Sequence, residues 1–151
     1  MSFEKDLKIG EIGEKECFWH LLNSKKTKQV IDVRYDPFFQ ALDVDFLQLD
    51  NNNHVNKIEV KTDRKGHETG NLFYETETTT NEGCLKRSQA DYVYYYLPET
   101  KETWVILLPK LKYWLAQQQF NEVIVEGRTK GYLIGFLELE MNGIALKIKG
   151  D

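Results

Sequence analysis

Asp43-Val44-Asp45-Phe46-Leu47-Gln48-Leu49-Asp50, Asn51-Asn52-Asn53-His54 and Val55-Asn56-Lys57-Ile58-Glu59-Val60-Lys61-Thr62 are three consecutive segments that decide the fold. The first and third have the alternating pattern of β-strands, in which every second side chain faces the same side. The asparagine run between them is typical of a turn, because Asn tolerates left-handed backbone conformations and bonds its own main chain. The three segments therefore predict an antiparallel hairpin.

The register of this hairpin follows from its apolar residues. A slip of one residue would turn the charged face of a strand into the core, so the apolar faces must stay together. Centring the turn on Asn52 pairs Phe46 with Ile58 and Val44 with Val60. We use this register to predict what lies on the opposite face.

The same register sets two carboxylates, Asp45 and Glu59, opposite each other, where like charges repel at a Cβ separation of roughly 5 Å. A divalent cation between them would remove the repulsion, and Mg²⁺ (or Mn²⁺) takes one or two carboxylates together with water and phosphate oxygens. Lys61 shares this face and is placed to position a metal-bound water or to neutralise a scissile phosphate. These are the components of metal-assisted phosphodiester hydrolysis.

A purely structural explanation of these residues stays open. An acidic residue two positions before a lysine occurs four times in the chain, at Asp6-Leu7-Lys8, Glu59-Val60-Lys61, Asp63-Arg64-Lys65 and Glu99-Thr100-Lys101. Glu59 and Lys61 would then belong to the solvated face of a half-buried hairpin, with a cross-strand ion pair between Asp43 and Lys61. The pattern alone does not separate the two interpretations.

Several segments together resemble the PD-(D/E)XK nuclease superfamily, whose common core is an αβββαβ arrangement. They are a glutamate on the first predicted helix (Glu14), Asp43-Val44-Asp45-Phe46, and Ile58-Glu59-Val60-Lys61-Thr62-Asp63. The segments Thr69 to Glu75 and Ser88 to Tyr92 are similar to a pattern in nuclease-like proteins of phages and mobile elements. The resemblance covers about residues 4 to 118. Val44 stands where the family has its proline, so Asp45 is matched by its place before Phe46, with Asp43 as the alternative.

The resemblance implies an α/β (α+β) fold with a mixed central sheet flanked by helices, as in restriction endonucleases. It implies a Mg²⁺-dependent deoxyribonuclease, an endonuclease of phage or mobile-element type, with Asp45, Glu59 and Lys61 as catalytic residues. Asp45, Glu59 and Glu14 are the expected metal ligands, and Asp43 and Glu75 the expected supporting residues. The alternatives are a non-catalytic nucleic-acid-binding module and a protein-interaction domain on the same fold.

The net charge of the chain limits how it could bind DNA. It carries 20 Lys and Arg against 24 Asp and Glu, a net charge of −4, which argues against polybasic wrapping of nucleic acid. Local clusters remain as candidates for phosphate contacts, at Arg64 and Lys65 and at Lys86, Arg87 and Ser88. Cutting both strands with one site per chain would suit a homodimer.

The remaining patterns predict one cytoplasmic domain over residues 1–151. The charged start is no signal peptide, no apolar run is long enough for a membrane, and Cys17 and Cys84 form no metal pattern. Helices are expected from Gly13 to Asn23 and from Pro109 to Gln118, and a short helix or an ordered turn is expected from Glu82 to Gln89. Strands are expected at 29–35, 42–50, 55–62, 71–78, 92–97, 103–108, 123–125 and 144–148. Residues 132–141 fit either type.

Overall fold

The computed structural model describes residues 3–77, 83–125 and 129–149. It has six helices in this part of the chain: α1 (Phe3–Asn23), α2 (Pro37–Ala41), α3 (Gly66–Thr69), α4 (Cys84–Arg87), α5 (Leu108–Leu115) and α6 (Phe136–Met141). The strands are β1 (Thr27–Asp32), β2 (Phe46–Asp50), β3 (Val55–Thr62), β4 (Asn71–Glu77), β5 (Tyr92–Leu97), β6 (Glu102–Leu107), β7 (Val123–Val125), β8 (Thr129–Gly135) and β9 (Ala145–Lys149). None of these helices combines the length and apolar character that crossing a bilayer requires.

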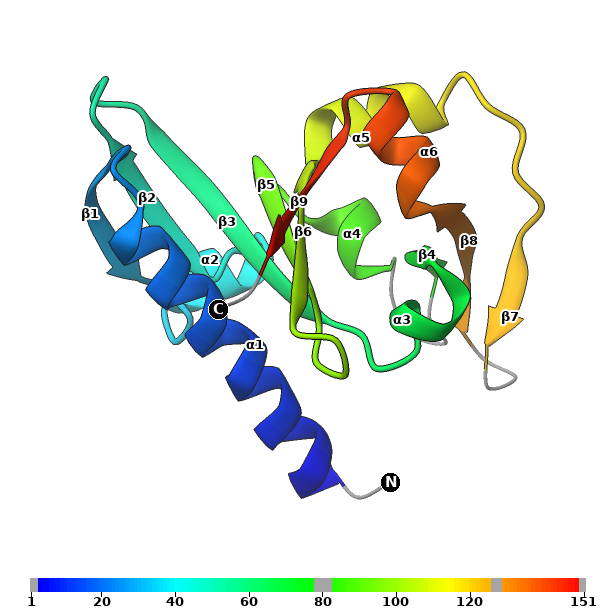
Figure 1. The fold of residues 1–151 in the computed structure, drawn as a ribbon, viewed down its shortest axis with the longest axis horizontal. Helices are drawn as coiled ribbons and strands as arrows, with labels where there is room; N and C mark the ends of the chain where they lie inside the picture. The colour runs from blue at the N-terminus through cyan, green and yellow to red at the C-terminus, as the bar shows by residue number, and fades with distance from the viewer. Residues whose placement is uncertain (1–2, 78–82, 126–128, 150–151) are drawn as a thin grey trace.

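The described strands form two sheets (Figure 1). The larger has the order β1-β2-β3-β5-β6-β9, with β3 and β5 parallel and its other pairs antiparallel. The smaller has the order β4-β8-β7 and is antiparallel. The protein is therefore an α+β fold with a mixed, mostly antiparallel central sheet flanked by helices, as the sequence predicts.

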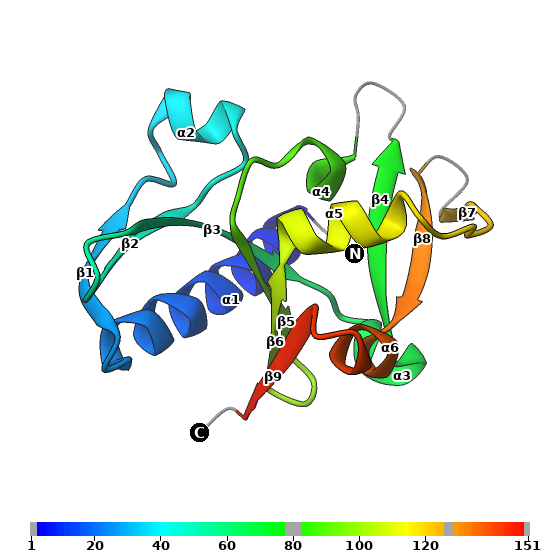
Figure 2. The same cartoon turned by 90° about the horizontal axis from the view of Figure 1, so that it is seen from above.

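The central sheet is covered on both faces near β5. Tyr94 packs with Phe46, Ile58 and residues of α1 in one cluster. Its neighbours Val93 and Tyr95 belong to the larger core, which also takes in β4, β8, α5 and α6. This explains why β5 is a nearly continuous run of apolar and aromatic residues, since a strand buried on both faces loses the usual alternation. Figure 2 shows α1 running along the other side of the sheet from α5.

A buried hydroxyl joins the two sheets. The Tyr95 hydroxyl donates to the Asp63 carboxylate, with 2.5 Å between the oxygens, and accepts the Phe73 backbone N–H at 3.3 Å. Burial is the main cause that raises the Tyr95 pKa well above its usual value, and the nearby Asp63 charge adds to it. This bond fixes the end of β3 against β4, directly after the strand that carries Glu59 and Lys61.

The central hairpin has the predicted register up to Phe46, which pairs with Ile58. The expected pairing of Val44 with Val60 is wrong, because β2 begins only at Phe46. Asp43 has a left-handed backbone with φ of 54°, and the Val44 N–H donates to the Phe39 carbonyl instead of to β3. The strand expected over 42–50 is therefore four residues shorter at its start, and the unpredicted helix α2 precedes it.

Other element boundaries differ in places where tertiary packing overrides local preference. The first helix begins at Phe3 although Gly10 and Gly13 weaken it, and the short helix α3 is not expected from the sequence. The ambiguous segment 132–141 divides into the end of β8 and α6. The expected boundary residues Thr78 and Glu82 lie outside the described residues.

Gly13 is the point at which α1 touches β3. A Cβ atom at this position would overlap the Thr62 hydroxyl and approach the Tyr96 ring at 3.4 Å, whereas a Cβ at Gly10 would meet nothing within 4 Å. Thr62 is β-branched and stiff about χ1, so it yields poorly. The helix can lie this close to the sheet because residue 13 has no side chain.

We predict that Gly13→Ala destabilises the protein by roughly 1–3 kcal/mol through this overlap, despite the better helix propensity of alanine. Gly10→Ala is the matched control and should stabilise by roughly 0.5–1 kcal/mol. Denaturant unfolding measures both. Thr62→Ala should remove most of the penalty of Gly13→Ala in a double-mutant cycle, and an additive cycle would contradict the contact.

Candidate active site

A cleft of about 750 Å³ opens between the first half of α1, the segment after β1 and the end of β3. It is lined by the carboxylates of Glu59 on β3 and of Asp45 just before β2, and by cationic side chains. The lining residues are Leu7, Ile9, Gly10, Glu11, Glu14, Arg34, Tyr35, Gln40, Asp45, Glu59, Val60, Lys61, Thr62 and Arg64. The cleft therefore holds five of the residues singled out from the sequence, which are Glu14, Asp45, Glu59, Lys61 and Arg64.

Asp45 lies where β2 and β3 part. Its backbone N–H donates to the Ile58 carbonyl at 2.8 Å, and its Oδ2 accepts the Val60 N–H at 2.7 Å. The Asp45 carboxylate thus accepts a backbone hydrogen bond from β3 just beyond the last backbone-paired residues. Burial raises the pKa of Asp45, while the Val60 N–H and the Lys61 charge lower it.

Glu59 is the buried carboxylate of the site, with only 5% of the residue exposed. Its Oε1 lies 3.3 Å from the Lys61 Nζ, and its Oε2 is buried without a hydrogen-bond partner among the described residues. Burial, and to a lesser extent the Asp45 charge, raises its pKa to about 7, against the opposing effects of the Lys61 charge and of a hydrogen bond with the Ser88 side chain. A carboxylate oxygen with no donor in a buried place is unusual and favours a ligand of positive charge.

Glu14 extends the acidic cluster from α1. Burial and then the Asp45 charge raise its pKa, and the Arg34 guanidinium opposes them from 3.6 Å. Arg34 is itself bound by Asp32 through two hydrogen bonds of 2.7 and 2.9 Å. Asp45 therefore raises the pKa of a carboxylate on either side of it, Glu14 on the helix and Glu59 on the strand.

These groups fit a divalent cation through oxygen donors. No three Asp, Glu, His or Cys side chains of the described residues form a ready ligand group. A hard cation such as Mg²⁺ needs only one or two protein carboxylates, and its other positions take water or phosphate. Asp45 and Glu59 supply that pair, and the unpartnered Glu59 Oε2 is the oxygen that a cation would satisfy.

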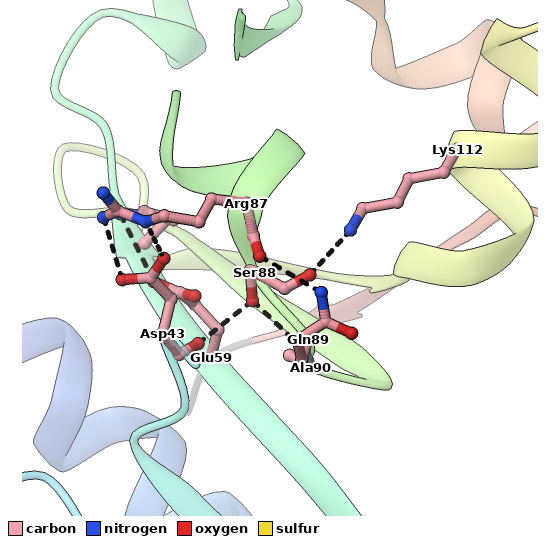
Figure 3. A network of polar contacts seen from close by, with 8 residues as sticks. Asp43, Glu59, Arg87, Ser88, Gln89, Ala90 and Lys112 are labelled. Atoms are coloured by element: carbon pink, nitrogen blue, oxygen red, sulfur yellow. Dashed lines mark hydrogen bonds and ion pairs between the residues drawn. The ribbon is translucent and has the colours of Figure 1, made fainter. Parts of the chain in front are cut away.

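Asp43 does not face Lys61, so the ion pair considered for these two residues is wrong. Its carboxylate accepts two hydrogen bonds from the Arg87 guanidinium, with nitrogen–oxygen distances of 2.6 and 3.1 Å (Figure 3). The Ser88 hydroxyl donates to the Asp43 carbonyl at 3.0 Å, and Lys112 on α5 donates to the Ser88 carbonyl at 2.6 Å. These contacts hold the left-handed turn from which the chain leads to Asp45.

The expected nucleic-acid contacts divide into two groups. Arg64 lines the cleft, and Lys65 and Lys86 are exposed. Ser88 is completely buried, so the expectation that it contacts nucleic acid is corrected. Arg87 directs its guanidinium to Asp43, which is a positioning contact inside the protein, and its expected phosphate contact stays a prediction.

The structure does not bring Glu75 to the cleft. This residue lies on β4, in the three-stranded sheet, and is not among the cleft-lining residues. The cleft instead contains Arg34 and Tyr35, which the sequence patterns did not single out. Arg34 reaches Glu14 only because α1 docks over the sheet, a contact that no local spacing encodes.

Comparisons with known proteins add one distant likeness. No protein-family model and no curated protein matches the chain. Among solved structures, the chain is similar to a bacterial homing endonuclease, I-Ssp6803I, with 20% sequence identity and a TM-score of 0.48 over 68% of each chain. A likeness at this level carries no weight for function, which rests on the site.

The raised pKa of Glu59 makes a prediction about stability in the absence of metal. A folded-state pKa of about 7 against an ordinary 4.5 means that the folded state holds more protons than the unfolded state between these values. The free energy of unfolding should therefore fall as pH rises from 5 to 8. Glu59→Gln should remove the part of this fall that Glu59 causes and be more stable than the native protein at pH 8, by at most about 3 kcal/mol.

Denaturant unfolding at pH 5 and pH 8 in the presence of a chelator measures this difference. The control is Glu75→Gln, which changes a half-buried carboxylate in the other sheet. A Glu59→Gln protein that is less stable than the native one at pH 8 would show that the charge of Glu59 is well compensated without a bound cation.

Proposed function

We propose that this protein is a Mg²⁺-dependent nuclease, active also with Mn²⁺, that hydrolyses phosphodiester bonds in DNA as an endonuclease of phage or mobile-element type. The observation that carries the proposal is the buried Glu59 beside the half-buried Asp45, with the Lys61 ammonium 3.3 Å from Glu59. A solvated structural hairpin would leave these charges in water. Here the fold removes Glu59 from water beside a second carboxylate, which destabilises the protein unless a cation binds.

Each residue has a distinct role in this proposal. Asp45 and Glu59 would hold the cation, and Glu14 from α1 adds a third carboxylate to the same cleft without completing a three-residue ligand group. When bound, the cation supplies Lewis acidity and lowers the pKa of a coordinated water. Lys61 orients the attacking water and offsets the negative charge that grows on the phosphate toward the transition state. Arg64 and Arg34 in the cleft walls stand where flanking phosphates of the DNA would pass.

We predict that Lys61→Ala lowers single-turnover cleavage by roughly 10²-fold or more, while DNA affinity measured in Ca²⁺ stays within a few-fold. The charge of Lys61 acts on the transition state more than on bound DNA, so rate and affinity should separate. Lys61→Arg should rescue only partly, because a planar fork does not replace a compact ammonium. Lys57→Ala, on the same strand and face but outside the cleft, is the matched control.

Plasmid, linear, flapped and branched DNA should all be tested as substrates for cleavage. If affinity falls in step with rate, Lys61 is a phosphate-binding residue. Binding of DNA without metal-dependent cleavage of any of these substrates would instead identify a non-catalytic nucleic-acid-binding module.

We predict that Mg²⁺ raises the melting temperature of the native protein, and raises it more at pH 8 than at pH 6. The cation binds the deprotonated carboxylate, and a Glu59 pKa of about 7 makes the apparent affinity roughly tenfold weaker at pH 6. Thermal unfolding across a Mg²⁺ titration measures the effect. Glu59→Gln should lose the shift and Glu75→Gln should keep it; an equal shift in both variants would place the cation elsewhere.

A further inference from the structure

A rigid turn after β1 stands at the rim of the cleft. The Asp36 N–H donates to the Val33 carbonyl at 3.1 Å, and the Asp36 carboxylate caps α2 by accepting the Phe38 N–H at 2.9 Å. The Gln40 side chain reaches back to the Arg34 carbonyl at 2.9 Å. Three hydrogen bonds therefore fix the backbone on both sides of Tyr35.

Tyr35 offers an exposed ring from this turn. It is 77% exposed and lines the same cleft as Asp45, Glu59 and Lys61. The Arg34 guanidinium carbon lies 5.3 Å from the centre of the Tyr35 ring, and Asp32 holds that guanidinium in place. The fold thus gives a large ring a fixed backbone, a cationic neighbour and a place at the rim of the cleft, with most of its surface left to water.

A second aromatic ring is exposed close by. Phe38, on the helix that Asp36 caps, is 67% exposed and packs edge-on against Phe39 with ring centres 5.1 Å apart. Exposed rings beside cationic side chains match the two parts of a nucleotide, because bases stack on aromatic faces and phosphates bind cations. Arg34, Lys61 and Arg64 supply the cations within the cleft.

We propose that Tyr35 is a stacking platform for an unpaired nucleobase, so that the preferred substrate is DNA with unpaired nucleotides beside the scissile phosphate. This inference rests on the proposed function for its ligand. In a continuous duplex both faces of every base are covered by neighbouring bases. Tyr35 could stack on such a base only after it had been unstacked, which costs free energy. Single strands, flaps and branch points present free faces, and stacking on an aromatic ring is tolerant of base identity.

The test measures DNA binding in Ca²⁺, separately from cleavage. The probes are a single strand, a flapped duplex and a blunt duplex, each carrying 2-aminopurine, whose fluorescence falls on stacking. Tyr35→Ala should weaken binding of the single strand and the flap by about tenfold and abolish the quenching, with duplex affinity within about twofold. Tyr35→Phe keeps the ring and should behave as the native protein. Tyr113→Ala is the control, since Tyr113 is 70% exposed on α5 and outside the cleft.

Three results would overturn the inference: unchanged single-strand binding in Tyr35→Ala, equal loss for duplex and single strand, or equal loss in Tyr113→Ala. The first of these would assign the ring to a different partner. The proposed function has its own outcome. If the protein cleaves DNA in a metal-dependent way and Tyr35→Ala cleaves as well as the native protein, the nuclease proposal holds and the stacking proposal fails. If single-strand binding depends on Tyr35 but no cleavage occurs, the stacking proposal holds and the nuclease proposal fails.

Discussion

The arrangement depends on a buried carboxylate, that of Glu59, held near the half-buried carboxylate of Asp45. Transfer of an ionised carboxylate into a protein interior is costly, and a second negative charge at short range adds to the cost. Lys61 compensates only in part, because it reaches one oxygen of Glu59 and leaves Oε2 without a donor. Natural sequences remove such conflicts where they serve no purpose, so their retention in a cleft is typical of a functional site.

The structure around this pair is built to keep β2 and β3 apart at one end. The ladder ends at Phe46, after the left-handed turn at Asp43, and Asp45 just outside it lines the cleft. That turn is held from a distance by Arg87 and Ser88, which Lys112 ties to α5. The position of Asp45 thus depends on a segment more than forty residues further along the chain, supported by the larger core.

The sequence predicts those parts of the molecule whose signal is local. β3 and β5 are predicted with their observed bounds, and Phe46 pairs with Ile58 as expected, because alternation and the turn determine a hairpin without help from the rest of the chain. Sequence-based prediction fails where the partner of a charged side chain lies far away in the chain. Asp43 could pair with Lys61 by register alone, and only the folded chain brings Arg87 closer. The same limit hides Arg34 and Tyr35, whose place at the cleft depends on the docking of α1 and α2.

The charge distribution explains how an acidic chain could bind a polyanion. A net charge of −4 gives no long-range attraction for DNA, and the carboxylates on the cleft floor repel phosphate directly. The positive side chains of the cleft do not outweigh these carboxylates, because Lys61 is paired with Glu59 and Arg34 lies near Glu14. Under the proposed function, a divalent cation bound by Asp45 and Glu59 would reverse this balance, because its charge would offset the two carboxylates where a phosphate enters. The ion needed for the chemistry would then also support substrate binding, and affinity in the cleft would depend on the occupancy of the metal site.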